Sequence, residues 1–381
     1  MSEVIKENKI SVLIIEDEEN QIQLINDAID DFNDDNKENK ISSDSVNNYN
    51  DGINILLQEN FDAAIIDLNL DQTKTEPNDL DGNRIVDIIV NKFRIPIIIR
   101  TGYPTQFSSE KISEKNSFIK IYSKDESVEL IIDQIVKWYT LGFSTTLGTK
   151  GILEQYLNEL FWKHISDNFN EWDIEDISFS KQEKSLLRYI VNVLSNYLEI
   201  DGESGDFEFF HPAEVYIKPP VKNELFFGDI LKDTQDNYYF ILTPSCEMAQ
   251  EKYKKILLSK ILKQEEVEGF VRARDNYIEK PESQNKKSSL EKWFRNGHQE
   301  SSGYHFLPPY SNFRGGFIDF QDILSVDPRA DNFNFSKVAT VTNQFAKDIS
   351  SRFTSYYARQ GQPNLNSQII INSIKLETES V

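Results

Sequence analysis

Four short apolar runs in the first third of the chain each end on polar residues, and they constrain the fold more than any other feature. They are IIEDEE from Ile14, IIDLNL from Ile65, IIIRTG from Ile97 and IKIYSKD from Ile119. Such runs, rich in β-branched residues, are typical of strands that are buried on both faces of a parallel sheet. Because ligands of open parallel sheets bind beyond the carboxyl ends of the strands, we expect the terminal residues to meet there.

The segments between these runs carry apolar residues at helical spacing. They lie at 22–32, 53–57, 82–89 and 128–138, and a weaker strand is expected at 41–46. Strands that alternate with helices predict an α/β domain. We expect a doubly wound, five-stranded parallel sheet with right-handed crossovers.

The carboxyl edge of that sheet would gather a group of polar side chains, which are Glu16, Asp17, Asp67, Thr101 and Lys124. Crowded carboxylates repel one another, so they need a cation to stay ionised together. Oxygen ligands without histidine or cysteine favour Mg²⁺. An aspartate beside that ion can attack a phosphoryl donor in line, and a lysine and a hydroxyl can then bind the acyl phosphate.

In their order and their strand-end positions, these residues resemble the receiver domain of bacterial response regulators, a CheY-like domain with a flavodoxin-like fold. The resemblance covers residues 9–140. It implies that Asp67 is the phosphoacceptor. The Mg²⁺ ligands that it implies are Glu16, Asp17, Asp67 and the backbone carbonyl of Asn69.

The same resemblance implies roles for the last two strands. Thr101 would be the switch hydroxyl, and Lys124 would match the lysine of the family. Phosphorylation would shift an equilibrium at the face formed by the fourth strand, the fifth strand and the helix between them. The partner would be a histidine kinase or a phosphotransfer protein. Beyond phosphotransfer and autodephosphorylation, no enzyme activity is expected of the receiver.

The chain departs from the family pattern in three places. The loop after Leu70, DQTKTEPNDLDG, is longer than the usual turn, and we interpret it as a solvated insertion. Ile121 stands where many receivers carry an aromatic residue, and neither Tyr103 nor Tyr122 matches that position. Asp125 replaces the proline that often follows the lysine. Phosphotransfer is still expected, whereas the usual aromatic-coupled switch is not.

A chain of 381 residues is too long for one ordinary core, and the sequence pattern changes twice along it. We expect a receiver at 1–141, a helical connector at 142–200 and an α+β output domain at 201–381. The connector could pair with a second copy of the chain in a homodimer, or it could pack on the chain's own output domain. Trp162 and Trp172 of the connector are expected in a core.

The output region carries no helix-turn-helix, phosphate-binding loop or nucleophile motif. A hairpin is expected within 226–243 and a strand at 316–326. One alternative function is a hydrolase or nuclease that the receiver regulates and that uses Cys246 or Glu247. A buried thiol is the favoured interpretation of Cys246. Residues 251–295 have a net charge of +4, which indicates a solvated face more than a nucleic-acid surface.

The charge of the whole chain narrows the choice of partners. The net charge is −22, of which −14 falls on residues 1–140, so binding to nucleic acid or to anionic membranes is not expected. A single cysteine excludes an internal disulfide, and no zinc spacing occurs. Without a signal peptide or an apolar run of membrane-spanning length, we expect a soluble cytoplasmic protein. A pseudo-receiver that serves as an interaction scaffold is a second alternative.

Overall fold

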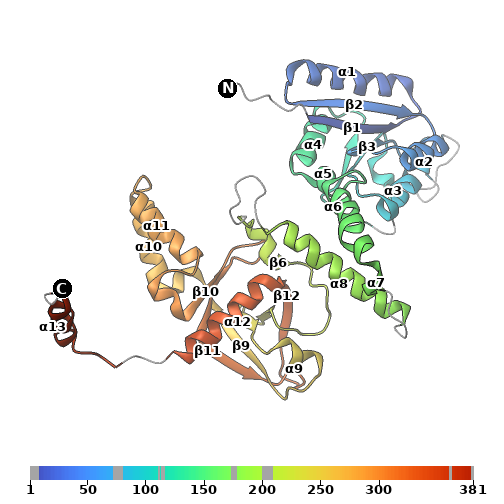
Figure 1. Ribbon diagram of the computed structural model, residues 1–381. Helices are drawn as coiled ribbons and strands as arrows, with labels where there is room; N and C mark the ends of the chain where they lie inside the picture. Colours follow the sequence, from blue (N-terminus) through green and yellow to red (C-terminus); the bar gives the residue numbers. More distant parts are fainter. Residues whose placement is uncertain are drawn as a thin grey trace. The chain divides into compact units, whose positions relative to one another are not determined.

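The computed structural model of the protein describes residues 8–71, 80–109, 112, 116–172, 178–199, 209–359 and 363–378. The chain divides into two compact units, Met1–Phe207 and Glu208–Val381. Figure 1 colours the first unit from blue to green and the second from green to red. None of the helices within the described ranges is both long enough and apolar enough to cross a membrane.

The first unit is built on a five-stranded parallel sheet in the order β2-β1-β3-β4-β5. The strands are β1 (Asn8–Ile15), β2 (Asn39–Val46), β3 (Ala63–Ile66), β4 (Ile97–Thr101) and β5 (Ile119–Ser123). Every side chain of β3 and β4 is buried, because helices cover both faces of the sheet. The predicted five-stranded parallel sheet is confirmed.

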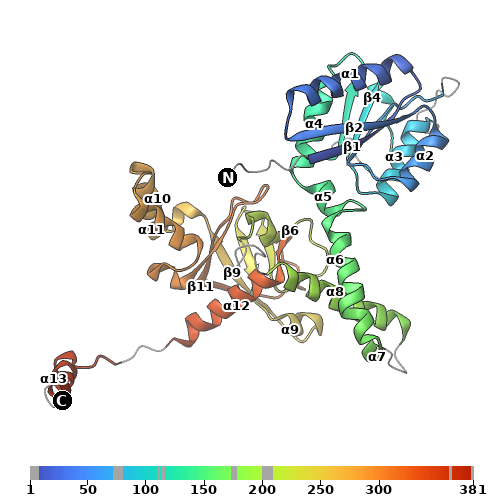
Figure 2. The ribbon, with the colours of Figure 1, turned by 45° about the horizontal axis from the view of Figure 1, so that its top comes forward.

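Two pairs of helices enclose this sheet, one pair on each face (Figure 2). The pairs are α1 (Glu19–Asp35) with α4 (Glu129–Thr140), and α2 (Tyr49–Gln58) with α3 (Asp81–Lys92). Side chains alternate along β1, so that Val12 and Ile14 join the core beneath α1 and α4, whereas Leu13 joins the core beneath α2 and α3. The sheet is therefore fixed in register by a separate core on each face.

The connection from β4 to β5 differs from the expectation. A switch face made of the fourth strand, a helix and the fifth strand was expected there. The described residues of this connection contain only one 3₁₀ turn, η2 (Pro104–Gln106), and no α-helix. Part of the connection, 110–111 and 113–115, lies outside the described residues. Proline at the first position of this turn fixes its own φ angle, and the N–H that it lacks would have no partner within a helix at that position.

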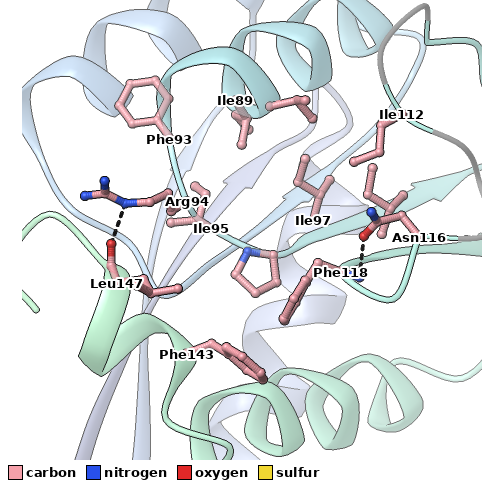
Figure 3. A pocket seen from close by; sticks show the side chains of 13 residues that line it. Ile89, Phe93, Arg94, Ile95, Ile97, Ile112, Asn116, Phe118, Phe143 and Leu147 are labelled. Atoms are coloured by element: carbon pink, nitrogen blue, oxygen red, sulfur yellow. Dashed lines mark hydrogen bonds between the residues drawn. The ribbon is translucent and has the colours of Figure 1, made fainter. Parts of the chain in front are cut away.

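An apolar cavity of about 230 Å³ lies on the α3 side of the sheet, at the amino ends of β4 and β5. It is closed from below by a short helix, α5 (Phe143–Leu147). Figure 3 shows Arg94 reaching the carbonyl of Leu147 and the ring of Phe118 facing that of Phe143. The Arg94 Nε donates over 2.6 Å to that carbonyl, and the two rings meet edge to face at 4.9 Å. The connector thus begins near the amino ends of β4 and β5, whereas the expected site lies at the carboxyl ends of the strands.

The connector continues as a helical hairpin. Its segments are α6 (Ile152–Leu160), the π-helical turn η3 (Phe161–Ile165), the 3₁₀ turn η4 (Ser166–Asn168), α7 (Phe169–Trp172) and α8 (Phe179–Tyr197). Aromatic contacts join them, including Trp172 with Tyr189 at 5.1 Å and Tyr156 with Tyr197 at 5.4 Å. The expectation that Trp162 lies in a core is wrong, because its side chain is 67% exposed.

The second unit is built on a seven-stranded sheet in the order β10-β11-β9-β8-β7-β12-β6, with antiparallel pairs throughout. The strands are β6 (Tyr216–Ile217), β7 (Asp229–Asp233), β8 (Tyr238–Ile241), β9 (Ile256–Leu262), β10 (Tyr304–Leu307), β11 (Gly316–Val326) and β12 (Phe335–Val341). The predicted hairpin within 226–243 and the predicted strand at 316–326 are both confirmed.

Helices pack on this sheet through three apolar clusters. They are α9 (Ser245–Ala249), α10 (Glu268–Glu279), α11 (Gln284–Phe294) and α12 (Asn343–Ala358), with 3₁₀ turns at Pro212–Val215, Gln264–Glu266 and Gln299–Gly303. The described side chains of helix α13 (Ser367–Thr378) do not join these clusters, and its Ile369, Ile370 and Ile371 side chains are exposed. Helix α12 contributes Ala346 and Ile349 to the largest cluster, and α11 contributes the fully buried Trp293 to another. The unit therefore combines an antiparallel sheet with separate helices.

Candidate functional site

The carboxyl edge of the first sheet holds the polar residues that the sequence singled out. Glu16 follows the last residue of β1, Asp67 follows β3, Thr101 ends β4 and Lys124 follows β5. Backbone hydrogen bonds hold these ends together: the Asp67 amide donates to the Ile15 carbonyl over 2.9 Å, and the Lys124 amide donates to the Thr101 carbonyl over 3.1 Å. We call Glu16, Asp17, Glu18, Asp67 and Lys124 the acidic cup.

The ammonium group of Lys124 links the carboxylates of the acidic cup. Its Nζ lies 3.0 Å from Asp67 Oδ2, 2.9 Å from Glu16 Oε2 and 3.1 Å from Glu18 Oε1. The side chains of Glu16 and Asp67 are 3% and 5% exposed, so these two ion pairs are largely shielded from water. Ion pairs of this depth hold their geometry better than surface pairs do.

The cup also has the donor set that a hard divalent cation prefers. Carboxylate oxygens of Glu16, Asp17 and Asp67 lie within 4.8 Å of one another. The Oδ1 atom of Asp67 and the Oδ1 atom of Asn69 are buried, and neither has a hydrogen-bond partner. Unpaired buried oxygens beside a cluster of carboxylates are the arrangement that Mg²⁺ satisfies. The residues present therefore fit the ion.

Burial and crowding change the acidity of the cup. Burial, followed by the charge of Asp67, raises the pKa of Glu16 to about 7 against the opposing effect of Lys124. Burial alone would lower the pKa of Lys124, but its hydrogen bond to Glu16 and its attraction to Asp67 outweigh burial and raise that pKa. A divalent cation beside Glu16 would oppose the effects of burial and crowding and would favour the ionised form of that carboxyl.

The remaining predicted residues lie around the cup in different ways. The hydroxyl of Thr101, on a side chain that is 1% exposed, accepts a hydrogen bond of 3.3 Å from the Tyr103 amide. Ile121 packs into the core beneath α2 and α3, whereas Tyr122 packs against the core on the opposite face. Tyr122 therefore does not substitute for an aromatic residue at position 121. Residues 72–79 of the long loop after Leu70 lie outside the described residues.

Two contributors to the site were not identified from the sequence. In the sequence, Glu18 stands out only as part of an acidic run, yet it pairs with Lys124. Arg100 lies within the run IIIRTG; the residue is 1% exposed, and its guanidinium donates over 3.1 Å to the Lys124 carbonyl. The signal was available for Arg100, because a charged residue inside a run of buried isoleucines needs a structural or functional reason.

Gly82 is a third residue whose role depends on the structure. It lies in the first turn of α3, where its amide donates over 3.0 Å to the Leu68 carbonyl. A Cβ atom at this position would lie 2.2 Å from the Asp67 carbonyl oxygen and 2.4 Å from the Leu68 Cα. Only glycine allows α3 to approach the backbone of the proposed phosphoacceptor this closely.

The candidates of the second unit are not gathered in this way. The expectation of a buried thiol at Cys246 is wrong, because that residue is exposed at the start of α9. Two of the aromatic residues available for base stacking in 251–295, Phe270 and Trp293, lie instead in a core that also includes Phe317. A stacking surface for nucleic acid on that segment would lose these two rings.

No family model and no curated protein matches this chain. Among solved structures, it is similar to a CheY-like receiver domain of a response regulator from Methylobacillus flagellatus, with 18% identity over 34% of this chain and 99% of that chain and a TM-score of 0.26. A two-component response regulator from Cytophaga hutchinsonii has 16% identity over 35% and 99%, with a TM-score of 0.26.

A response regulator protein from Burkholderia pseudomallei, whose structure holds a phosphorylated aspartic acid, a calcium ion and citrate, has 16% identity over 46% of this chain and 92% of that chain, with a TM-score of 0.24. All three similarities have low identity and TM-scores below 0.5. The function of the first unit is therefore inferred from the geometry of the acidic cup.

Proposed function

We propose that the first unit is the receiver of a two-component response regulator and that Asp67 accepts a phosphoryl group in a Mg²⁺-dependent step. The observation that carries this proposal is that the two carboxylate oxygens of Asp67 have different surroundings. Lys124 holds Oδ2 at 3.0 Å, whereas Oδ1 is buried without a partner. One oxygen is thus anchored, and the other is free to bind a metal ion or to attack phosphorus.

In the proposed reaction, a carboxylate oxygen of Asp67 forms a bond to phosphorus while the bond from phosphorus to the donor's leaving group breaks in line. Glu16, Asp17 and Asp67, with Asn69 beside them, would hold Mg²⁺, which when bound offsets the charge on the transferring group. Lys124 pairs with an oxygen of the acyl phosphate. The Thr101 hydroxyl, which ends the adjacent strand, would donate to another oxygen of that group.

The donor that we propose in the cell is a phosphohistidine on a histidine kinase or a phosphotransfer protein, since its imidazole is the leaving group in such a transfer. The second unit is then the output or interaction domain, joined to the receiver by the connector. The scaffold alternative gives no account of the unpaired, buried Oδ1 of Asp67. The enzyme alternative would use Cys246 or Glu247, and of these Cys246 is exposed.

The test uses the full chain and acetyl phosphate as a small phosphodonor. We expect Mg²⁺-dependent addition of one phosphoryl group, seen by intact mass, and its loss in Asp67→Asn. Asp30→Asn is the matched control, because Asp30 is an exposed aspartate on α1. Labelling that persists in Asp67→Asn, or that does not need Mg²⁺, would contradict the proposal.

We further propose a homodimer through the connector. Helix α8 has no fully buried residue along its 19 residues, although it packs against α6 and α7 by one half-buried face. A separate apolar stripe, formed by Leu187 and Val191 on α8 and by Leu198 at its C-cap, is 58–64% exposed. Its steps of four and seven residues follow the seam of a coiled coil.

The charges along α8 support an antiparallel pairing of two copies. The first half of α8 is basic overall, with Lys181, Lys184 and Arg188 against one acid, whereas Glu199 follows its last turn. Two antiparallel copies would bring the basic start of one helix near the acidic end of the other. A second copy of this chain is therefore the partner that fits the stripe.

A further inference from the structure

Arg100 is a buried cation that the proposed reaction does not use. It lies in β4 directly before Thr101, and its side chain is among the largest that are fully buried. Side chains alternate along the strand, so Arg100 points to the face covered by α1 and α4, as Ile98 does. A guanidinium is buried in a protein only when other groups compensate its charge and satisfy its donors.

The hydrogen bonds of Arg100 join three segments around the acidic cup. Its Nη1 donates to Oε1 of Gln21 in the first turns of α1, and its Nη2 donates over 3.1 Å to the backbone carbonyl of Lys124. Both acceptors are neutral oxygens. Arg100 therefore fixes the position of the Lys124 backbone relative to β4 and α1. Among the described residues, the carboxylates of the cup form their direct ion pairs with Lys124 and not with Arg100.

The charge of Arg100 acts on the acidic cup through space. Burial lowers the pKa of Arg100, and the carboxylates that oppose this effect are Glu16, Asp67 and Glu18. The cup thus has two resident cations, the Lys124 ammonium in contact with the carboxylates and the Arg100 guanidinium behind them. Charges that are shielded from water inside a protein affect one another's energies more strongly than charges in water do.

We infer that Arg100 is a positioning residue of this site, which anchors Lys124 for the acyl phosphate and at the same time weakens the affinity of the cup for its divalent cation. The inference rests on the proposed function for the first of these effects and on electrostatics alone for the second. The two effects have opposite signs. Removing Arg100 would tighten cation binding and slow phosphoryl transfer, whereas loss of a merely structural side chain would weaken both.

The main variant is Arg100→Met, which keeps a long apolar stem and removes the charge and both hydrogen bonds. We expect its dissociation constant for Mg²⁺, measured by titration calorimetry on the full chain, to fall by about tenfold. We expect its rate of labelling by acetyl phosphate at saturating Mg²⁺ to fall by about tenfold, because the Lys124 ammonium is less well fixed. Arg84→Met is the matched control, since the Arg84 side chain is 50% exposed and pairs with Asp81 on α3.

A second variant, Arg100→Lys, keeps the charge and loses the planar fork that reaches both acceptors. We expect Mg²⁺ affinity within about twofold of the parent chain, with labelling still slowed. It also gives the readout if Arg100→Met does not fold, which thermal unfolding would reveal. Labelling by Arg100→Lys at the parental rate would overturn the anchoring role, and Mg²⁺ affinity that is unchanged or weaker in Arg100→Met would overturn the electrostatic role.

The design separates this inference from the proposed function. If the parent chain binds Mg²⁺ but is never labelled, the phosphoacceptor proposal fails, and the anchoring role fails with it. The electrostatic role is still decided by calorimetry on Arg100→Met. If the parent chain is labelled and both Arg100 variants match it in rate and affinity, only the inference about Arg100 fails.

Discussion

At the residue scale, Lys124 contributes both to stability and to the proposed chemistry. Its ammonium group contacts the carboxylates of Glu16 and Asp67, whose side chains are 3% and 5% exposed. Removing Lys124 therefore leaves these two buried carboxylates without the cation that pairs with both. We expect Lys124→Met to lower the free energy of unfolding without divalent ions by about 3 kcal/mol, because breaking a buried pair leaves an uncompensated charge. Chemical denaturation with and without Mg²⁺ checks this expectation. Mg²⁺ should restore part of the loss, and an equal loss in both conditions would contradict the electrostatic explanation.

Glu16 gives the site a pH dependence with a defined sign. Its pKa in the folded chain is raised to about 7 from an ordinary value of 4.5, so between these values the folded state holds a proton that the unfolded state has released. Without divalent ions, the stability contributed by this group therefore falls as the pH rises from 4.5 to 7. Mg²⁺ needs the ionised form, so its affinity should rise with pH.

The expected rise in Mg²⁺ affinity approaches tenfold per pH unit below pH 7 and levels off above it. Calorimetry between pH 5.5 and 8 measures this profile, and Glu16→Gln should remove the steep limb while lowering affinity at every pH. A parent profile that stays flat across this range would show that the cation does not compete with a proton on Glu16.

The strand-end residues could be predicted to meet because a parallel sheet puts its carboxyl ends on one edge. That rule applies to Glu16, Asp67 and Lys124 without knowledge of any side-chain conformation. The same rule could not predict the role of Arg100. It concerns residues at strand ends, whereas Arg100 lies inside β4 and its side chain faces α1. Its partners are a side chain from another element and a backbone carbonyl, and neither is encoded in local spacing.

At the scale of elements, the close packing of α3 depends on Gly82. A Cβ atom there would meet backbone atoms of Asp67 and Leu68 at 2.2–2.4 Å, and the backbone cannot move aside as a flexible side chain can. We expect Gly82→Ala to destabilise the chain by about 2 kcal/mol and to slow labelling at Asp67. Gly102→Ala is the control, since a Cβ atom there meets nothing within 4 Å. Equal thermal stability of the two variants would contradict this account.

The strands β1, β3, β4 and β5 were predictable because they are apolar runs with clear breaks, whereas the more polar β2 gave a weaker signal. The connection between β4 and β5 was not predictable, since the resemblance supplied a helix that the local residues do not support. Pro104 starts the turn η2, and the described chain leaves it without α-helical continuation. The sequence also overestimated the burial of Trp162, because helical spacing alone cannot tell which of two apolar faces finds a partner.

At the scale of the whole molecule, the sequence predicted the architecture of the second unit better than its biochemical function. The second unit has the predicted hairpin and an antiparallel sheet, because alternation and turn residues specify them locally. Its function does not follow from that fold, since function depends on sites that a fold can carry or lack. The most direct information on how the chain works as an assembly comes instead from the uncovered stripe on α8.

That stripe predicts the oligomeric state. Val191 lies at its middle and is 64% exposed, so a glutamate there would be solvated in a single chain but buried and unpaired in a dimer. We expect the parent chain to be a dimer at micromolar concentration and Val191→Glu to be a monomer of unchanged thermal stability, as measured by light scattering and thermal unfolding. Asn192→Glu, an exposed neighbour on the polar side of α8, should stay dimeric. Each copy carries a negative net charge, which opposes association unless the burial of apolar side chains offsets it. If the parent chain is a monomer, or if Val191→Glu still forms dimers, α8 does not form the interface.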